Sequence, residues 1–285
     1  MSICRAPSTA GSWMPRPNRP GRARRLFALG GRISGTEFLA VAALVFAALG
    51  LAWYAVTAGG LIRPLFLPSP GQVLARLDTL RQSGQLTADI SISVYRITVG
   101  FLISTLFALP IGVLIGCYRF WEAAIEPLVD FVRYMPVVAF VPLTILWTGT
   151  GDGQKFLIIF IGTFFQQVLL VMDNVRSVPR DFINLGRTLE MPDWRILYRI
   201  VIPSAMPAIW DSMRISLGWA WTWLVVAELV AATSGLGYRI TTAQRFFQTD
   251  LIFGYLLILG ILGLATDQAM KFAGRRLFRY LEVQR

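Results

Sequence analysis

Residues 184–203 read NLGRTLEMPDWRILYRIVIP and lie between long apolar runs. We call this stretch the island. Each ionised side chain in it would cost roughly 3 kcal/mol or more at the centre of a bilayer. These side chains are Arg187, Glu190, Asp193, Arg195 and Arg199. The island therefore lies in water or against another protein.

The island is also patterned for helices. Two sets of apolar residues recur at helical spacing on either side of Pro192. The sets are Phe182, Leu185 and Leu189 before the proline and Trp194, Leu197 and Val201 after it. They predict two short amphipathic helices with a joint at the proline. Apolar stripes on a polar segment indicate docking to a partner, and the alternative is that they lie on the membrane interface, where Trp is common.

The composition is that of an integral membrane protein in a lipid bilayer. Of the 285 residues 55% are hydrophobic and 15% charged, with a mean hydropathy of +0.58. Soluble domains carry a charged share of about a quarter. The formal net charge of +11 does not indicate nucleic acid, because the basic residues lie in short polar segments between apolar runs. It fits instead the retention of Lys and Arg on the cytoplasmic side of a membrane.

Metal and cofactor chemistry is not expected. The chain has no His, and its two cysteines, Cys4 and Cys117, lie far apart in sequence. The usual Cys/His metal ligands are therefore missing, and no disulfide framework is indicated.

Six apolar segments predict about six transmembrane helices in an all-α protein. They cover residues 38–58, 91–117, 123–148, 156–172, 205–232 and 251–269. We expect Pro110 and Gly112 to interrupt the second span, and Pro136 and Pro142 to kink the third. A short amphipathic helix around Leu77 is expected before the second span, along the outer interface.

The chain divides into three parts. Residues 1–35 contain many arginines and no acidic residue, which predicts a disordered cytoplasmic tail. Residues 36–280 form the transmembrane domain with a cytoplasmic loop at 177–203, and residues 281–285 form a cytoplasmic end. Six spans place both termini and the island on one side. That side holds the excess of Lys and Arg, so the positive-inside rule also makes it cytoplasmic.

Four charged residues fall inside the second and fifth predicted spans. Glu228 and Arg96 lie towards the same side, so a salt bridge between the second and fifth spans is predicted. Asp211 and Arg214 are three residues apart and can pair along one helix face. Pairing that holds helices together is favoured over contact with a substrate.

Some of these residues are also candidates for a translocation path. The candidates are Gln166, Gln167, Arg214 and Glu228. An amide can hydrogen-bond an oxoanion without trapping it. Glutamine can equally bridge two helices, and the sequence does not decide between these roles. The tryptophans of the fifth span, Trp219, Trp221 and Trp223, could also line the path, but filling space or marking an interface is the favoured role.

The island resembles the cytoplasmic EAA loop of permease subunits in binding-protein-dependent ABC importers. Residues 200–203 (IVIP) match the Ile-x-Leu-Pro ending, and residues 187–189 match the filler before the loop's glycine. The Glu-Ala-Ala positions hold residues 184–186 (NLG), and Glu190 stands at the glycine position. Because glycine accepts a left-handed helix cap that glutamate adopts only at a cost, we expect similar docking with a different local turn.

Further motifs are similar to permeases for nitrate, bicarbonate, taurine and alkanesulfonates. They are LPSPGQVL (67–74), SVYRITVGF (93–101), RYMPVVAFVPLTILWTGTG (133–151) and VVAELVAATSGLGYRI (225–240). The resemblance covers roughly residues 35–280. It implies a type I ABC importer permease fold in the bacterial inner membrane.

The resemblance also implies partners and residue roles. Two permease copies, expected to be a homodimer, would each present a coupling helix to one of a pair of cytoplasmic ABC ATPase subunits, and an extracytoplasmic solute-binding protein would deliver a small anion. The implied coupling residues are Asn184, Arg187, Glu190, Asp193, Trp194, Arg195 and Leu197, with Trp194 and Leu197 as the apolar anchor. The sequence has no G-x-x-x-x-G-K-[ST] loop, so ATP hydrolysis is assigned to the partner and the chain is not expected to be an enzyme.

Two other functional classes fit less well. A stand-alone channel or secondary transporter is expected to show internal repeats and an ion site at the midplane, and the sequence shows neither. A membrane-embedded enzyme needs a nucleophile with its base or a set of metal ligands, which a chain without His supplies poorly.

Overall fold

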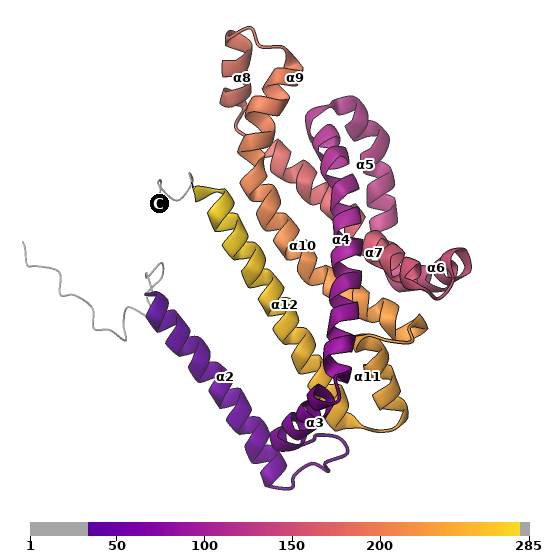
Figure 1. Cartoon of the computed structure of the whole chain (residues 1–285). Helices are drawn as coiled ribbons and strands as arrows, with labels where there is room; N and C mark the ends of the chain where they lie inside the picture. Colours follow the sequence, from indigo (N-terminus) through magenta and orange to yellow (C-terminus); the bar gives the residue numbers. More distant parts are fainter. Residues whose placement is uncertain (1–33, 280–285) are drawn as a thin grey trace, which may run out of the picture. The chain divides into compact units, whose positions relative to one another are not determined.

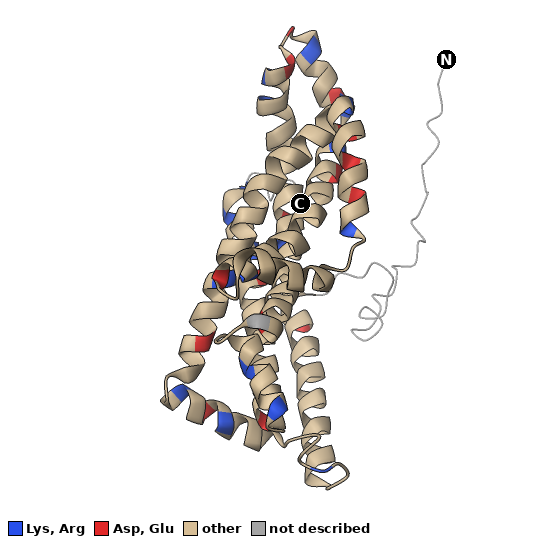
Figure 2. Ribbon diagram, turned by 90° about the vertical axis from the view of Figure 1, so that its right-hand side faces the viewer, with Lys and Arg blue, Asp and Glu red and all other residues tan. Residues whose placement is uncertain are grey.

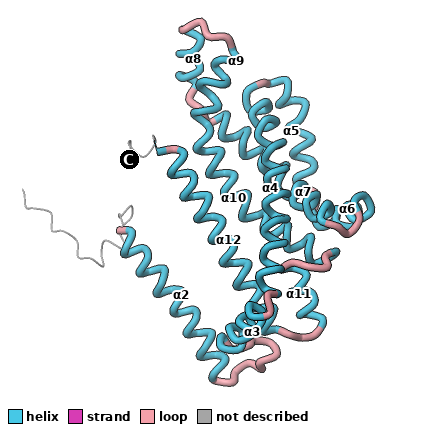
Figure 3. The backbone as a smooth tube through the Cα atoms, in the orientation of Figure 1, coloured by secondary structure: helices cyan, strands magenta, loops and turns pink. Residues whose placement is uncertain are grey.

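The computed structural model describes residues 34–279, and every regular element in that range is helical (Figure 3). The chain divides into two compact units at Ala55 and Val56. The first unit holds most of α2 (Gly35–Ala58), which confirms a helix at the first predicted span. Of the tail predicted at 1–35, only residues 34 and 35 are described. The end predicted at 281–285 lies outside the described residues.

Four long helices form the body of the second unit (Figure 1). They are α4 (Gln85–Cys117), α7 (Asp152–Arg176), α10 (Ile202–Ala231) and α12 (Thr249–Leu277). Three short elements, α8 (Arg180–Thr188), α9 (Asp193–Ile196) and the π-helical η2 (Leu197–Val201), project at one end, which we call the island end. The opposite end, which we call the α11 end, carries α3 (Pro70–Gln82) and α11 (Leu236–Arg245).

The number of spans is close to the prediction. Within the described residues, α2, α4, α7 and α12 are each long and apolar enough to cross a membrane, and a bent pair of segments adds a fifth candidate. The remaining predicted span is α10, whose 30 residues agree with the expected range 205–232. It is long enough to cross, although it carries Asp211, Arg214 and Glu228.

The third predicted span is broken rather than kinked. Helix α5 (Arg119–Arg133) ends before Pro136, and the chain then turns by 89° into η1 (Val137–Phe140) and α6 (Val141–Thr148). A proline disfavours helical geometry in the residue before it, which here is Met135, and it lacks an N–H donor of its own. The break therefore falls at the position where the sequence predicted a kink, but the chain turns through a larger angle than a kink.

The expected interruption of the second span is wrong. Helix α4 runs without a break through Pro110 and Gly112. A Cβ at Gly112 would lie 2.6 Å from Cβ of Val171 on α7. Gly100 likewise faces Ile159. These glycines let α4 and α7 approach closely, as small residues do between membrane helices.

The short amphipathic helix before α4 is confirmed as α3. The hydroxyl of Ser69 and the side chain of Gln72 form a capping box at its start. Val73 and Leu80 are buried, and the side chain of Leu77 packs against Gly254 of α12. The apolar face of α3 is therefore used, at least in part, against the bundle.

Candidate functional site

The turn inside the island is a Schellman motif. The amide of Glu190 donates to the carbonyl of Arg187 at 2.9 Å, and the amide of Met191 donates to Gly186 at 3.1 Å. Glu190 has φ +54°, in the left-handed region that glycine accepts without strain. The expected different local turn is therefore wrong at this position, because glutamate adopts the left-handed conformation itself.

Helix α8 turns its small and branched residues inward. Gly186 is buried, and a Cβ there would lie 3.0 Å from side-chain atoms of Ile196 and Ile200. Ile183 packs, partly buried, against the same hydrophobic cluster. The inner face of α8 is therefore satisfied by α9 and η2.

The longer apolar residues of the island point the other way. Leu185 is 57% exposed, Leu189 65% and Trp194 63%, and Phe182 is also exposed. We call these four residues the apolar stripe. Its α8 members are the residues that the sequence pattern placed on one face. The fold leaves this face uncovered.

The two predicted anchors differ in position. Trp194 is exposed, with the guanidinium of Arg195 5.2 Å from the centre of its ring. Leu197 is partly buried and packs against the hydrophobic core, so it supports the island from inside. The predicted polar contacts are all exposed on the island, and they are Asn184, Arg187, Glu190, Asp193 and Arg195.

A groove of about 730 Å³ lies beside the island, between the α4–α5 turn and α8, α9 and η2. Its charged lining is mainly basic and consists of Arg119, Arg176, Arg180 and Arg187 with Glu122 and Asp193. Arg176 bonds Glu122 and Glu126 of α5, each at 3.1 Å. These bonds fix α7 to α5 at this end of the bundle.

At the α11 end, the predicted pair between Arg96 and Glu228 is confirmed. Nη1 of Arg96 lies 2.9 Å from Oε1 of Glu228, and both side chains are buried. The same guanidinium bonds Asp152 at 2.7 Å and the carbonyl of Ser234 at 2.7 Å. Arg96 therefore joins α4 to α7, to α10 and to the turn before α11.

The carboxylate of Glu228 is fully engaged. It accepts a hydrogen bond from the hydroxyl of Ser93 at 2.8 Å and one from the amide of Gly237 at 2.9 Å, in addition to Arg96. A buried charge needs such a complete set of partners to be tolerated. This arrangement favours the structural role of Glu228 over contact with a substrate.

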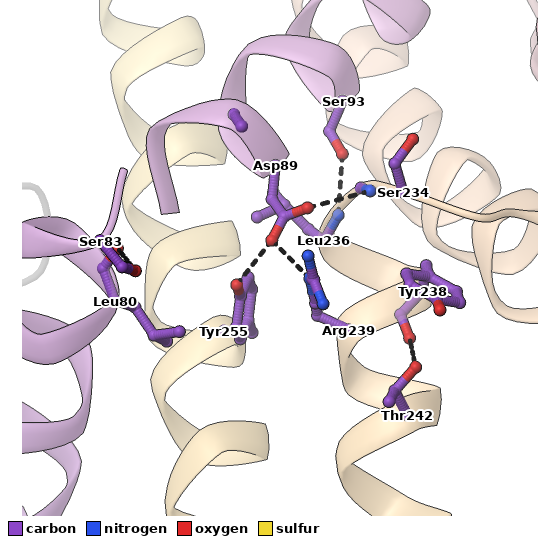
Figure 4. A network of polar contacts seen from close by, with 12 residues as sticks. Leu80, Ser83, Asp89, Ser93, Ser234, Leu236, Tyr238, Arg239, Thr242 and Tyr255 are labelled. Atoms are coloured by element: carbon purple, nitrogen blue, oxygen red, sulfur yellow. Dashed lines mark hydrogen bonds and ion pairs between the residues drawn. The ribbon is translucent and has the colours of Figure 1, made fainter. Parts of the chain in front are cut away.

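A second buried carboxylate, Asp89, extends this network (Figure 4). It accepts hydrogen bonds from the hydroxyl of Tyr255 at 2.8 Å, Nε of Arg239 at 2.8 Å and the amide of Gly235 at 3.3 Å. Sequence reasoning missed this cluster. Its members lie on three separate helices and a turn, and only the acidic residue in the otherwise uncharged start of α4 hinted at it.

Arg214 ties two spans together as well as pairing within its own helix. Nε lies 3.6 Å from Asp211, as predicted, and Nη1 lies 3.0 Å from Asp267 of α12. The shorter contact is the one between helices. The structure thus gives Arg214 a bridging role that the sequence did not predict.

The two glutamines differ in environment. Gln167 is buried, accepts from Ser104 at 2.7 Å and donates to Thr105 at 3.2 Å, so it bridges α7 to α4. Gln166 lines a cavity of about 350 Å³ together with Trp219 and Trp223. Gln167 therefore bridges two helices, which is the alternative role that the sequence left open. Of the two glutamines, only Gln166 lines an open cavity.

Residues 108–279 match the family model described as binding-protein-dependent transport system inner membrane component. A protein of Brucella abortus (strain 2308), named as a probable ABC transporter permease, is 41% identical over 230 residues, which cover 81% of this chain and 91% of the relative.

Two other relatives carry substrate names. SsuC of Bacillus subtilis (strain 168), a permease protein whose name assigns it to aliphatic sulfonate transport, is 33% identical, covering 80% of this chain and 83% of its own. The taurine transport system permease protein TauC of Escherichia coli (strain K12) is 31% identical, covering 79% and 84%. Among solved structures, a chain of the inward-facing MetNI methionine ABC transporter matches with a TM-score of 0.60 at 19% identity, covering 70% of this chain and 97% of that one.

Proposed function

The chain belongs to the family of binding-protein-dependent transport system inner membrane components, and from this premise we infer that it is the transmembrane subunit of an ATP-driven importer for a small anion. In this proposal ATP is hydrolysed by a separate cytoplasmic subunit pair. The chain moves its cargo and catalyses no reaction.

The observation that carries the proposal is the exposed apolar stripe of the island. Leu185, Leu189 and Trp194 stand outside the bundle although the inner face of the island is packed. Exposed apolar patches of this kind mark sites of protein contact. The stripe would dock into the ATPase, and closure of the nucleotide-binding pair would then rock the helix bundle between its two accessible states.

The orientation follows from the same assignment. The island end would face the cytoplasm, and so would the end of α12, where Arg275 and Arg276 lie. The α11 end would face outwards, towards an extracytoplasmic binding protein. If all six predicted spans cross the membrane, the N-terminus would also lie in the cytoplasm. The protein would lie in the inner membrane of a bacterium, and a second copy of the chain would complete the path.

The cargo class is proposed from the relatives. Proteins named for aliphatic sulfonate and taurine transport are 33% and 31% identical to the chain. Nitrate and bicarbonate complete the group of small anions that the sequence motifs suggest. The anionic head is the chemistry that these solutes share.

The test exchanges one exposed leucine for aspartate at each end of the bundle. Leu189 on the stripe is 65% exposed and Leu74 on α3 is 64% exposed, so the two substitutions are matched in burial and charge. We expect Leu189→Asp to abolish co-purification of the ATPase and to reduce ATP-driven uptake by tenfold or more. Leu74→Asp should leave co-purification intact. Equal retention of the ATPase by both variants would refute docking through the stripe.

A further inference from the structure

We propose that the cavity between α5, α7 and α10 binds the cargo in passage, and that Arg133 contacts its anionic head while apolar walls hold a short carbon chain. The cargo would then be an organic sulfonate rather than a bare inorganic anion. This inference rests on the proposed function, because it names the cargo site and the cargo class of the same importer.

In the proposed orientation, the cavity lies well inside the membrane. Arg133 is the last residue of α5, 14 residues beyond Arg119, and therefore about 21 Å from the island end at 1.5 Å per residue. Gln166 stands ten residues before Arg176 on α7, about 15 Å from the same end. The hydrocarbon core is about 30 Å thick. Gln166 is therefore at mid-depth, and Arg133 lies about two-thirds of the way across.

A cation at this depth needs a reason, because ionisable residues inside a membrane are costly and mark functional positions. The side chain of Arg133 is 34% exposed, whereas that of Arg96 is 5% exposed. Arg133 bonds Asp130 at 3.1 Å through Nε and the hydroxyl of Tyr134 at 3.0 Å through Nη2. Its Nη1 has no hydrogen-bond partner within the described chain, so it can still donate.

The pair with Asp130 also suits a transient site. A guanidinium already facing one carboxylate attracts a second anion less strongly than a free cation does. Conduction requires binding strong enough for entry and weak enough for release. Arg133 therefore meets both requirements in the proposed cargo site.

The remaining lining combines polar groups with apolar walls. Gln166 and Thr222 line the cavity, and an amide N–H and a hydroxyl are groups that can donate to sulfonate oxygens. The apolar wall consists of Val132, Met135, Val137, Ile161 and Phe165. The volume of about 350 Å³ lies at the lower end of the range for small-molecule sites. Nitrate or bicarbonate would leave the apolar wall without contacts, whereas an alkanesulfonate uses both surfaces.

One wall depends on a glycine. A Cβ at Gly162 would collide with the indole of Trp223, so the ring lies directly on the helix backbone. Both residues line the cavity. Replacing this glycine therefore pushes the tryptophan and changes the shape of the apolar wall without altering any charge.

The experiment measures protection of a cysteine in the cavity. In the purified importer complex, in a Cys4→Ser, Cys117→Ser background, Thr222→Cys is labelled with N-ethylmaleimide with and without butanesulfonate or nitrate. We expect saturating butanesulfonate to slow labelling about tenfold and nitrate to have little effect. Leu74→Cys, exposed on α3 and outside the cavity, is the control and should be labelled at the same rate throughout.

Variants then assign the contact. Arg133→Gln should raise the butanesulfonate concentration for half-protection about tenfold, the loss expected for a hydrogen bond to a charged group, and Arg133→Lys should recover part of it. Gly162→Ala should weaken protection by longer alkanesulfonates more than by methanesulfonate. Unchanged labelling of Leu74→Cys and an unchanged gel-filtration profile show that a variant is folded.

Three results would overturn the inference. They are protection by nitrate as strong as by butanesulfonate, no protection by either anion in a complex that imports an alkanesulfonate, and a Thr222→Cys that is unreactive without cargo because a second copy covers it. Failure of the proposed function is a different result. In that case the wild-type chain neither binds the ATPase nor supports ATP-driven uptake of any anion.

Discussion

The two ends of the bundle treat ionisable groups in opposite ways. At the α11 end, Arg96, Glu228 and Asp89 are buried, and each bonds partners on several elements. At the island end, charged residues of both signs lie on exposed surfaces of α8 and α9 (Figure 2). Trp194 and Leu189 are exposed among them. At the α11 end the buried ionisable groups bond to groups within the chain. The island end leaves charged groups and apolar surface exposed for a partner.

This difference separates residues that hold the fold from residues that serve transport. A buried ion pair with complete partners is weak evidence for function, because removing either partner damages the structure first. Exposed apolar residues on a polar segment contribute little to stability, so their presence needs another explanation. The same substitution should therefore have different consequences at the two ends.

The largest effect is expected for Arg96→Ala. The substitution leaves the Glu228 carboxylate buried without its cation and removes the bonds to Asp152 and Ser234. Breaking a buried pair in this way costs about 3–5 kcal/mol. We expect a large fall in the thermal unfolding midpoint in detergent. Arg81→Ala, which removes an exposed pair with Asp78, is the control and should change it little.

Exchanging the two charges should not repair the site. In the double variant Arg96→Glu, Glu228→Arg, a carboxylate would face Asp152 and a cation would face the amide of Gly237. Recovery of wild-type stability by this double variant would show that the pair acts alone and that the surrounding bonds contribute little.

A smaller effect is expected for Tyr255→Phe. The ring of Tyr255 is fully buried, and its hydroxyl donates to Asp89 at 2.8 Å. Removing a hydrogen bond to a charged group costs about 1.5–3 kcal/mol, less than Arg96→Ala because Arg239 and Gly235 still bond the carboxylate. Tyr95→Phe, at an exposed tyrosine, should leave the unfolding midpoint unchanged. Equal effects of the two substitutions would contradict a closed α11 end.

The sequence predicted contacts where local pattern and depth carried enough information. The Arg96–Glu228 pair followed from two opposite charges expected at the same depth, and the helices of the island followed from apolar spacing around Pro192. The long apolar runs located the spans because the bilayer requires continuous apolar helices.

The sequence did not reveal contacts that depend on how the helices are rotated about their axes. Tyr255 reads as one more aromatic residue in an apolar span, and only the packed bundle directs its hydroxyl to Asp89. Arg133 is one charge among several in the third predicted span, and the cavity beside it forms only because the chain turns by 89° after α5. Pro110 was read as a break, yet α4 absorbs it.

The smallest expected effect lies at the island end and has the opposite sign. Glu190→Gly should stabilise the protein by about 1 kcal/mol, because the left-handed conformation at φ +54° strains any residue with a Cβ. Glu190→Ala keeps the Cβ and removes only the charge, so it should give no gain in the unfolding midpoint. If both variants gain equally, the charge of Glu190 is responsible rather than its backbone. A gain confined to the glycine variant would show that the island keeps a strained residue at its turn.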